Sequence, residues 1–432
     1  MKDSGIEWIG EIPEEWNTNN VFQLFTQVKN RNTDLQEQNL LSLSYGKIKR
    51  KDIDTTDGLL PESFDGYNII EANDIVLRLT DLQNDHKSLR VGLATERGIV
   101  TSAYLTIRNR SDSLSKYLYY YLYSFDIAKG FYGMGAGVRQ GLNWDGIKWL
   151  RILTPSVTEQ QRIVSFLDTE CSRIDAVIEQ TRASIEEYKK LKQAVITQAV
   201  TKGIYPNRPM KDSGIEWLGN IPIEWDLIPF RHILCERNEK NSPIKTKERL
   251  SLSIDLGVTL YAEKTTNLDR FKDDFEQYKI AHVGDLVMNS MNMIVGATGV
   301  SNYYGCVSPA YYTFFDATKD HITSKYCEYI FRSKTMLRVL YSIGKGIYAI
   351  VRGDDRVNTC RLKVSREDLR SLILPFPSIN EQREIVQFLN EKTAEIDQLI
   401  VKKESLIEEL EAYKKSLIYE YVTGKKEVGN EL

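Results

Sequence analysis

The chain has 432 residues, 42% of them hydrophobic, and its 57 Lys and Arg residues against 60 Asp and Glu residues give a net charge of −3. This length allows two to four domains. No apolar run reaches the roughly 18 residues of a membrane-spanning helix, and the opening Met1-Lys2-Asp3-Ser4-Gly5 has no hydrophobic signal region, so we expect a cytoplasmic protein. Five scattered cysteines without a CxxC pair argue against a zinc site or a disulfide framework.

The distribution of charge says more about partners than the net charge does. A net negative charge argues against a nucleic-acid binder, because phosphate contacts need clustered Lys and Arg. Residues 331–370, however, hold ten basic residues against four acidic ones, whereas residues 1–16 have a net charge of −4. The sequence therefore predicts a basic surface in its second half, away from the acidic segments.

An internal repeat organises the chain. Residues 2–16 recur almost unchanged as residues 211–225, an offset of 209, and the same offset places the Leu-Ser-Leu-Ser of residues 41–44 on residues 250–253. Further on the offset becomes 222, so the second half carries 13 extra residues. They fall before Pro377, in the stretch that holds most of the basic cluster. Two copies of one scaffold that differ mainly there suggest one reader with two targets.

In chain order, each half opens with a turn-rich segment and then alternates short β-like runs with loops. Residues 74–79 and 98–104 are such runs, and residues 115–125 predict a helix with Tyr117, Tyr120 and Tyr121 on one face. Core packing is the favoured role for these tyrosines, with base stacking as the alternative.

Each half ends in a long predicted helix. Residues 156–159 and 378–381 are typical of capping boxes, in which a Ser hydroxyl and a Glu carboxylate pair with the first N–H groups. Apolar residues at 3–4 spacing form two matching seams. About 40 residues would span about 60 Å, so we expect the helices to pair antiparallel; the alternative is that each packs on its own globule. The seam residues are Ile163, Leu167, Ile174, Ile178, Ile185, Tyr188 and Val195, then Ile385, Leu389, Ile396, Ile400, Ile407, Leu410 and Leu417.

The predicted fold is α+β (mixed α/β), with two homologous domains separated by two long antiparallel helices that form a coiled coil with a pseudo-twofold repeat. The predicted bounds are 1–155 for the first domain, 156–203 for the first helix, 204–377 for the second domain, 378–425 for the second helix and 426–432 for a tail.

Catalytic motifs are missing. The four histidines have no metal-ligand spacing and no nucleophile motif beside them. Gly133-x-Gly135-x-Gly137 resembles a phosphate-binding loop but follows a predicted helix, where a dinucleotide fingerprint should follow a strand. Its counterpart, Gly344-Lys345-Gly346, fits flexible backbone that approaches a DNA groove, or an ordinary surface loop. We therefore expect no metal and no cofactor on this chain.

Basic and polar side chains in loops and at strand ends are the candidates for DNA contact, and for any one of them a solvated surface position is the alternative. The candidates in the first half are Lys47, Lys49, Arg50, Lys51, Arg78, Lys87, Arg90, Arg139 and Gln140. Those in the second half are Lys264, Asn289, Asn292, Lys345, Tyr348, Arg352 and Arg356. We expect Arg139→Ala or Arg352→Ala to weaken DNA binding without affecting assembly with partners.

These motifs together resemble a family along nearly the whole chain. The Gly-Ile-Glu-Trp openings at Gly5 and Gly214, the Leu-Ser-Leu-Ser segments and the Pro-x-x-x-Glu-Gln-x-x-Ile entries at Pro155 and Pro377 are similar to those of type I restriction–modification specificity subunits. The resemblance implies two target recognition domains that each read half of a bipartite DNA site, and helices that set the spacer. It also implies partners: two methyltransferase subunits and motor-nuclease subunits, which would carry S-adenosylmethionine, ATP and Mg.

Two other functions stay open at this point: a self-sufficient DNA methyltransferase or nuclease, and a coiled-coil scaffold that binds protein only. Methyl transfer by the isolated chain would favour the first alternative. Absence of salt-dependent, sequence-selective DNA binding would favour the second. If the helices set a spacer, inserting about four residues, one turn, between Ile174 and Ile185 should change the spacing between half-sites.

Overall fold

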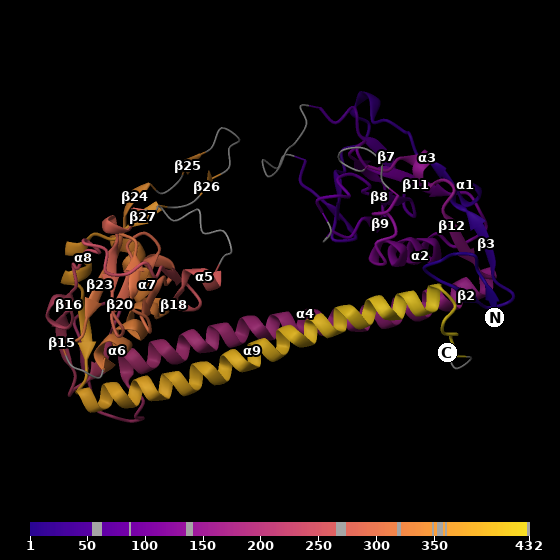
Figure 1. The fold of residues 1–432 in the computed structure, drawn as a ribbon. Coiled ribbons are helices and arrows are strands. Elements are labelled where there is room, and N and C mark those ends of the chain that lie inside the picture. Colours follow the sequence, from indigo (N-terminus) through magenta and orange to yellow (C-terminus); the bar gives the residue numbers. More distant parts are fainter. Residues whose placement is uncertain are drawn as a thin grey trace. The chain divides into compact units, whose positions relative to one another are not determined.

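The computed structural model describes residues 1–53, 63–85, 88–134, 141–264, 274–317, 321–347, 350–351, 357–358 and 361–429. The chain forms two compact units, one of residues 1–182 and 404–432 and one of residues 183–403 (Figure 1). The division runs through the long helices rather than at their ends, because each unit consists of a globule and the helix segments packed against it. The domain bounds given above therefore stay predictions.

The globule of the first unit is built from short antiparallel strands and few helices. Its strands are β1 (Lys2–Asp3), β2 (Glu11–Ile12), β3 (Asn17–Asn20), β4 (Phe25–Gln27), β5 (Leu41–Ser44), β6 (Lys47–Arg50), β7 (Asn68–Ile70), β8 (Ile75–Leu77), β9 (Val91–Leu93), β10 (Gly98–Val100), β11 (Leu105–Asn109) and β12 (Arg151–Thr154). Its helices are α1 (Val21–Leu24), η1 (Thr33–Leu35), α2 (Ser115–Ile127) and α3 (Trp144–Ile147).

The globule of the second unit has the same strands in the same order, with additions. Its strands are β13 (Met210–Asp212), β14 (Asn220–Pro222), β15 (Asp226–Pro229), β16 (Cys235–Glu236), β17 (Leu250–Ser253), β18 (Gly257–Leu260), β19 (Lys279–Ala281), β20 (Leu286–Asn289), β21 (Thr298–Val300), β22 (Gly305–Val307), β23 (Tyr311–Phe315), β24 (Lys345–Ile347), β25 (Ile350–Val351), β26 (Val357–Asn358), β27 (Arg361–Lys363) and β28 (Ile373–Phe376). Its helices are η2 (Phe230–His232), α5 (Tyr261–Lys264), η4 (Phe275–Gln277), η5 (Met293–Val295), α6 (Ile322–Arg332), α7 (Lys334–Ile343) and α8 (Arg366–Ser371).

The sheet topology is duplicated strand for strand. The central sheet runs β4-β11-β8-β9 in the first unit and β16-β23-β20-β21 in the second, all antiparallel. The same correspondence holds for the two-stranded pairs β5-β6 and β17-β18, β7-β10 and β19-β22, and β3-β12 and β15-β28. The mixed α and β fold with an internal repeat is thus confirmed.

The described residues in the additional stretch of the second half form paired strands. Strands β24 and β27 pair through Lys345 and Lys363, and β25 pairs with β26. Residues 344–346 were expected to be a flexible loop, but Gly344 ends helix α7 and Lys345–Ile347 is a paired strand. That expectation was wrong, because the partner strand β27 lies further along the chain than a local sequence pattern can indicate.

The two long helices, α4 (Val157–Lys202) and α9 (Ile379–Val422), pack against each other in antiparallel fashion within each unit (Figure 1). In the first unit Lys414 Nζ lies 2.6 Å from Asp175 Oδ1, and Arg182 lies 3.1 Å from Glu411. In the second unit Lys192 Nζ lies 2.6 Å from Asp397 Oδ2. These ion pairs join the first part of α4 to the last part of α9, and the last part of α4 to the first part of α9. The two helices are therefore antiparallel.

The predicted seam is buried, although not by helix pairing alone. Ile163 and Leu167 lie in one core with the first globule and with Leu417 of α9, while Ile385 and Leu389 lie in a core with the second globule. Both expected modes of packing therefore occur together. Side chains of the seam that are less than 9% exposed are Ile163, Leu167, Ile174, Ile178, Ile185, Ile385, Leu389, Ile396 and Leu417. Tyr188, Val195, Ile400, Ile407 and Leu410 are half-buried.

The predicted capping boxes are half present. The hydroxyls of Ser156 and Ser378 accept from the backbone N–H of Glu159 (3.2 Å) and Glu381 (3.4 Å). The carboxylate of Glu381 is used differently, because it accepts from Trp225 Nε1 at 2.9 Å and forms an ion pair with Arg208. The bond to Trp225 thus attaches the start of α9 to the repeated opening motif of the second unit.

Replacing Glu381 with Gln should lower the free energy of unfolding of the second unit by about 2 kcal/mol, because the charge-assisted bond to half-buried Arg208 is lost while the Trp225 acceptor is kept. Urea unfolding would measure this. Glu224→Gln is the matched control, since Glu224 is an exposed partner of the same arginine, 57% accessible, and should cost less than about 1 kcal/mol. Equal costs for both variants would contradict the assignment.

The repeated opening motif is a tight turn with the same bonds in both units. The N–H of Gly5 and Gly214 donates to Asp3 (2.9 Å) and Asp212 (3.0 Å), and both glycines have positive φ, +65° and +67°. Only glycine adopts this conformation without strain. Each motif covers the C-terminal end of a long helix: Lys425 Nζ donates to a carbonyl of the first motif, and Lys202 Nζ to carbonyls of the second.

The tyrosines of α2 are core residues, as favoured by their spacing. Tyr117 and Tyr121 are 0% exposed and Tyr120 is 8% exposed. The hydroxyl of Tyr117 donates to the Val422 carbonyl of α9 at 3.3 Å. None of the described helices is long and apolar enough to cross a membrane.

Candidate nucleic-acid interface

The β5-β6 hairpin carries the first group of candidate DNA contacts. Its turn, Tyr45-Gly46, has φ of +49° and +74°, the left-handed pair that a two-residue hairpin turn requires. Strand pairing of Leu41 with Arg50 and Ser42 with Lys49 leaves the basic side chains on the exposed edge strand β6. Lys49 on the strand and Lys51 just after its end are both exposed.

Two of the hairpin's cations already have carboxylate partners. Lys47 Nζ lies 3.6 Å from Asp175 on α4, and Arg50 forms an ion pair with Glu96. The Arg50 bond lowers the pKa of the Glu96 carboxyl, so the pair stays charged at neutral pH. The side chains of Lys47 and Arg50 are still 66% and 73% exposed, but their charge is partly neutralised by these carboxylates. Lys49 and Lys51 are therefore the first candidates on this hairpin for phosphate contact.

Arg90 does not lie on the surface, so its prediction as a DNA contact was wrong. Its side chain is 0% exposed, and its guanidinium donates to Tyr132 Oη and to four backbone carbonyls. The carbonyls belong to Arg78, Thr80, Asp81 and Asp85. Arg90 thus stabilises the polar loop by binding carbonyls of residues 78–85 from the buried side.

Asp126 lies next to this arginine. Its carboxylate accepts from the Arg90 backbone N–H at 2.6 Å. Burial raises the pKa of Asp126 to about 6, against the lowering effect of the Arg90 N–H and guanidinium. On the loop itself, Arg78 is partly exposed and lies 3.1 Å from Asp85. Arg78 thus remains accessible from outside the loop that Arg90 supports.

In the second unit the structure places three candidates. Asn289 ends strand β20 and is buried, with its Oδ1 accepting from the Met291 N–H at 3.1 Å. Asn292 is exposed at the start of η5. Lys345 on β24 is 77% exposed and pairs with Asp368 at 2.9 Å. Asn289 therefore shapes a turn, while Asn292 and Lys345 present side chains to solvent.

The remaining candidates cannot be placed. Lys87, Arg139, Gln140, Tyr348, Arg352 and Arg356 lie outside the described residues, as does the side chain of Lys264. Their roles stay predictions. Among the described residues no group of three or more His, Cys, Asp or Glu side chains is arranged to hold a metal ion.

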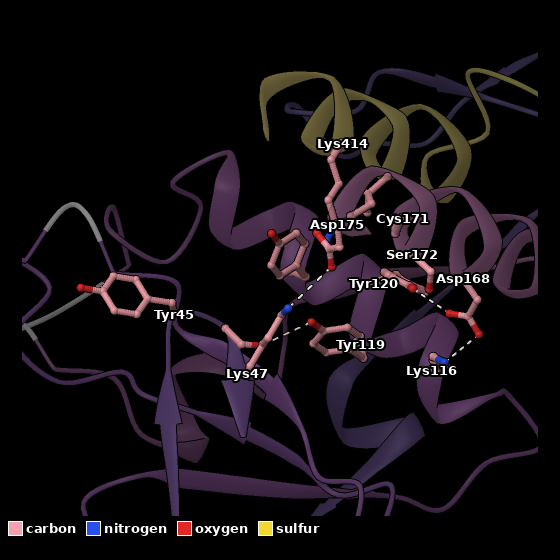
Figure 2. A pocket seen from close by; sticks show the side chains of 13 residues that line it. Tyr45, Lys47, Lys116, Tyr119, Tyr120, Asp168, Cys171, Ser172, Asp175 and Lys414 are labelled. Carbon is pink, nitrogen blue, oxygen red and sulfur yellow. Dashed lines mark hydrogen bonds and ion pairs between the residues drawn. The ribbon is translucent and has the colours of Figure 1, made fainter. Parts of the chain in front are cut away.

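A pocket that no sequence pattern indicated lies where the first globule meets its helix segments. Figure 2 shows this pocket of about 400 Å³, with Tyr120 pointing to Asp168 and Lys47 pointing to Asp175. Lys116 Nζ lies 2.6 Å from the same Asp168. A corresponding pocket of about 820 Å³ lies in the second unit between α6, the β17-β18 turn and both long helices. Comparison of the two repeat copies shows shared residues such as Tyr120 and Tyr329, but not that they line a cavity.

The comparisons with known proteins fit this architecture. The putative type I restriction enzyme MjaX specificity subunit of Methanocaldococcus jannaschii is 21% identical over 406 residues, covering 88% of this chain and 87% of the relative. A chain solved in work on complex assembly and conformational transition of the type I R-M system superposes with a TM-score of 0.65 at 14% identity, covering 96% of this chain and all of that one. The chain has the fold of a type I specificity subunit.

A second solved structure agrees. The HsdS subunit from Thermoanaerobacter tengcongensis has a TM-score of 0.50 at 14% identity, covering 96% of this chain and 98% of the subunit. No family model matches the chain. The resemblance inferred from the repeated motifs is nevertheless confirmed, since the similarity to specificity subunits in sequence and in fold extends along nearly the whole chain.

Proposed function

We propose that this chain is the DNA sequence-recognition subunit of a type I restriction–modification complex and performs no catalysis itself. One observation carries the proposal: a complete recognition globule occurs twice with the same strand order, and each copy sits on segments of the same two long helices. The second copy contains the paired strands β24-β27 and β25-β26, and of these β24-β27 carries the basic residues Lys345, Arg361 and Lys363. A duplicated scaffold with divergent basic edges suits two half-sites of different sequence.

The physics of DNA recognition supports this arrangement. Two readers on one face of a duplex enter successive major grooves about 34 Å apart. Helices of 46 and 44 residues are about 66–69 Å long at 1.5 Å per residue, and so are long enough to span such a distance. In this proposal the helix pair acts as the ruler that sets the spacer between the half-sites.

Catalysis would belong to partner subunits. Two methyltransferase subunits would bring S-adenosylmethionine, and motor-nuclease subunits would bring ATP and Mg. The repeat supports a partner count of two, because equivalent surfaces occur twice on this chain. We place the assembled complex in the cytoplasm, where DNA is accessible.

The experiment is to map methylated positions in DNA from cells that carry the system, and then to measure binding of the purified subunit with its methyltransferase partner to the mapped site. A bipartite site, bound selectively over scrambled DNA, is expected. Methyl transfer by the isolated chain would contradict the proposal and support a self-sufficient methyltransferase. Assembly without any sequence-selective retention of DNA would support a protein scaffold.

Lys49→Ala with Lys51→Ala should weaken binding to all DNA sequences about equally and reduce the slope of log K against log salt by about two, since each phosphate contact contributes about 0.9. Fluorescence anisotropy at several salt concentrations measures this. The matched control is Lys189→Ala with Lys190→Ala on α4, whose lysines are paired with Glu186 and Glu187. An unchanged slope in the hairpin variant would remove this edge from the interface.

A further inference from the structure

Each globule meets the long helices at a pocket, here called its joint, and the two joints are built from equivalent positions. With offsets of 209 for the globules and 222 for the helices, 12 of the 13 residues that line the first joint correspond to residues that line the second. Both joints include a hairpin tip, a globule helix and both long helices. The joint was therefore already present in the scaffold that was duplicated.

The parts of the joint that touch the long helices are the same in both copies. Tyr120 Oη donates to Asp168 on α4 at 2.7 Å, and Tyr329 Oη donates to Asn390 Oδ1 on α9 at 2.7 Å. Seven residues after each of these acceptors, an ion pair joins the two long helices at 2.6 Å: Asp175 with Lys414 in the first unit, and the equivalent Asp397 with Lys192 in the second.

The parts that touch the hairpin tip differ. In the first joint Tyr119 Oη donates to the Gly46 carbonyl at 3.4 Å. In the second, Arg332 donates to the equivalent tip carbonyls of Ile254 (2.7 Å) and Asp255 (3.1 Å). Lys47, which reaches Asp175, is replaced by Leu256. The contacts to the hairpin tip thus differ between the two units, whereas the contacts to the long helices are shared.

The joint adds directional hydrogen bonds to a hydrophobic attachment. Ile163, Leu167, Cys171, Ile174 and Ile178 of α4 pack in the core of the first unit, and Asp168 and Asp175 lie among them in the sequence. A hydrophobic core is non-directional and permits small rotations; a hydrogen bond with defined geometry restricts them. Burial raises the pKa of Tyr120 and of Tyr329, so both hydroxyls stay protonated and donate.

We propose that Tyr120 and Tyr329 are positioning residues that set the angle of each globule on its helix segment and thereby fix which half-site spacing is read. The proposal rests on the proposed function. Neither tyrosine contacts DNA in this assignment. A small rotation of a globule at its joint displaces the surface that contacts DNA. Loss of the tyrosine hydrogen bond should therefore broaden the range of tolerated spacers more than it weakens binding to DNA with the preferred spacer.

The test uses Tyr120→Phe and Tyr329→Phe, singly and together, in the subunit assembled with its methyltransferase partner. Binding is measured to the mapped site with spacers shortened or lengthened by one and two base pairs. The double variant loses two hydrogen bonds and is expected to lose about tenfold in discrimination against altered spacers, or about threefold for each bond. Affinity for the preferred site should fall less than about threefold.

Two controls separate positioning from general stability. Tyr123→Phe removes the hydroxyl of another joint tyrosine that, among the described residues, has no hydrogen-bond partner, and should leave discrimination unchanged. Asp168→Asn keeps an acceptor for Tyr120, as Asn390 does for Tyr329, and should also preserve it. If the Phe variants melt at lower temperatures but discriminate between spacers as the wild type does, this inference is overturned and the proposed function is not affected. A wild-type complex without selective binding would overturn the proposed function as well.

Discussion

Replacing Arg90 with Met is expected to lower the free energy of unfolding of the first unit by about 4 kcal/mol. The side chain of Met fills similar space, but four backbone carbonyls and the Tyr132 hydroxyl lose a buried donor together. The buried carboxylate of Asp126 loses a neighbouring positive charge as well. Thermal unfolding would measure the loss, and hydrogen exchange should locate it to residues 78–90.

Arg97→Met is the matched control. Arg97 is 51% exposed and forms ion pairs with Glu37 and Glu71, so its loss should cost less than about 1 kcal/mol. If Arg90 acted instead as a DNA contact, its variant would fold with normal stability and show only weaker DNA binding. That outcome would contradict the buried position derived above.

Lengthening both long helices by one heptad is expected to shift the preferred spacer by about three base pairs, because seven residues add about 10.5 Å of helix and a base pair adds about 3.4 Å. Duplicating residues 179–185 in α4 and residues 401–407 in α9 keeps the seam, since Ile178 and Ile185, like Ile400 and Ile407, are seven residues apart. Binding of the assembled complex to a series of spacers measures the shift.

The paired design matters because the helices are antiparallel and clamped by ion pairs on both sides of the insertion, such as Asp175 with Lys414 and Asp397 with Lys192. An insertion in α4 alone, such as the four-residue insertion suggested by the sequence, shifts its seam relative to that of α9. It should therefore reduce stability as well as alter the spacing, and the paired duplication is the sharper test. An unchanged spacer preference in the well-folded double duplication would refute the ruler.

Sequence patterns were sufficient for features that repeat or depend on local periodicity. The offset of 209 predicted two equal globules, and the 3–4 spacing placed residues such as Ile163 and Ile385 in the core. Side-chain environments set by distant partners were beyond such patterns. Arg90 lies in a polar stretch typical of a surface loop, yet its partner Tyr132 comes 42 residues later. Likewise, Lys47 finds Asp175 on a helix that begins far downstream.

The β24-β27 hairpin is held at both ends by atoms of the surrounding globule. The Gly344 N–H donates to the Leu340 carbonyl as α7 ends, and Val364 donates its N–H to the Ser290 carbonyl at 3.0 Å while its own carbonyl accepts from Tyr312 Oη at 3.1 Å. Between these two anchors Leu362 is buried, so a replacement segment that keeps an apolar residue at that position leaves the core intact. New binding preferences could therefore be engineered, or acquired in evolution, by grafting a foreign segment between positions 344 and 364, much as antibodies vary loops on a constant framework.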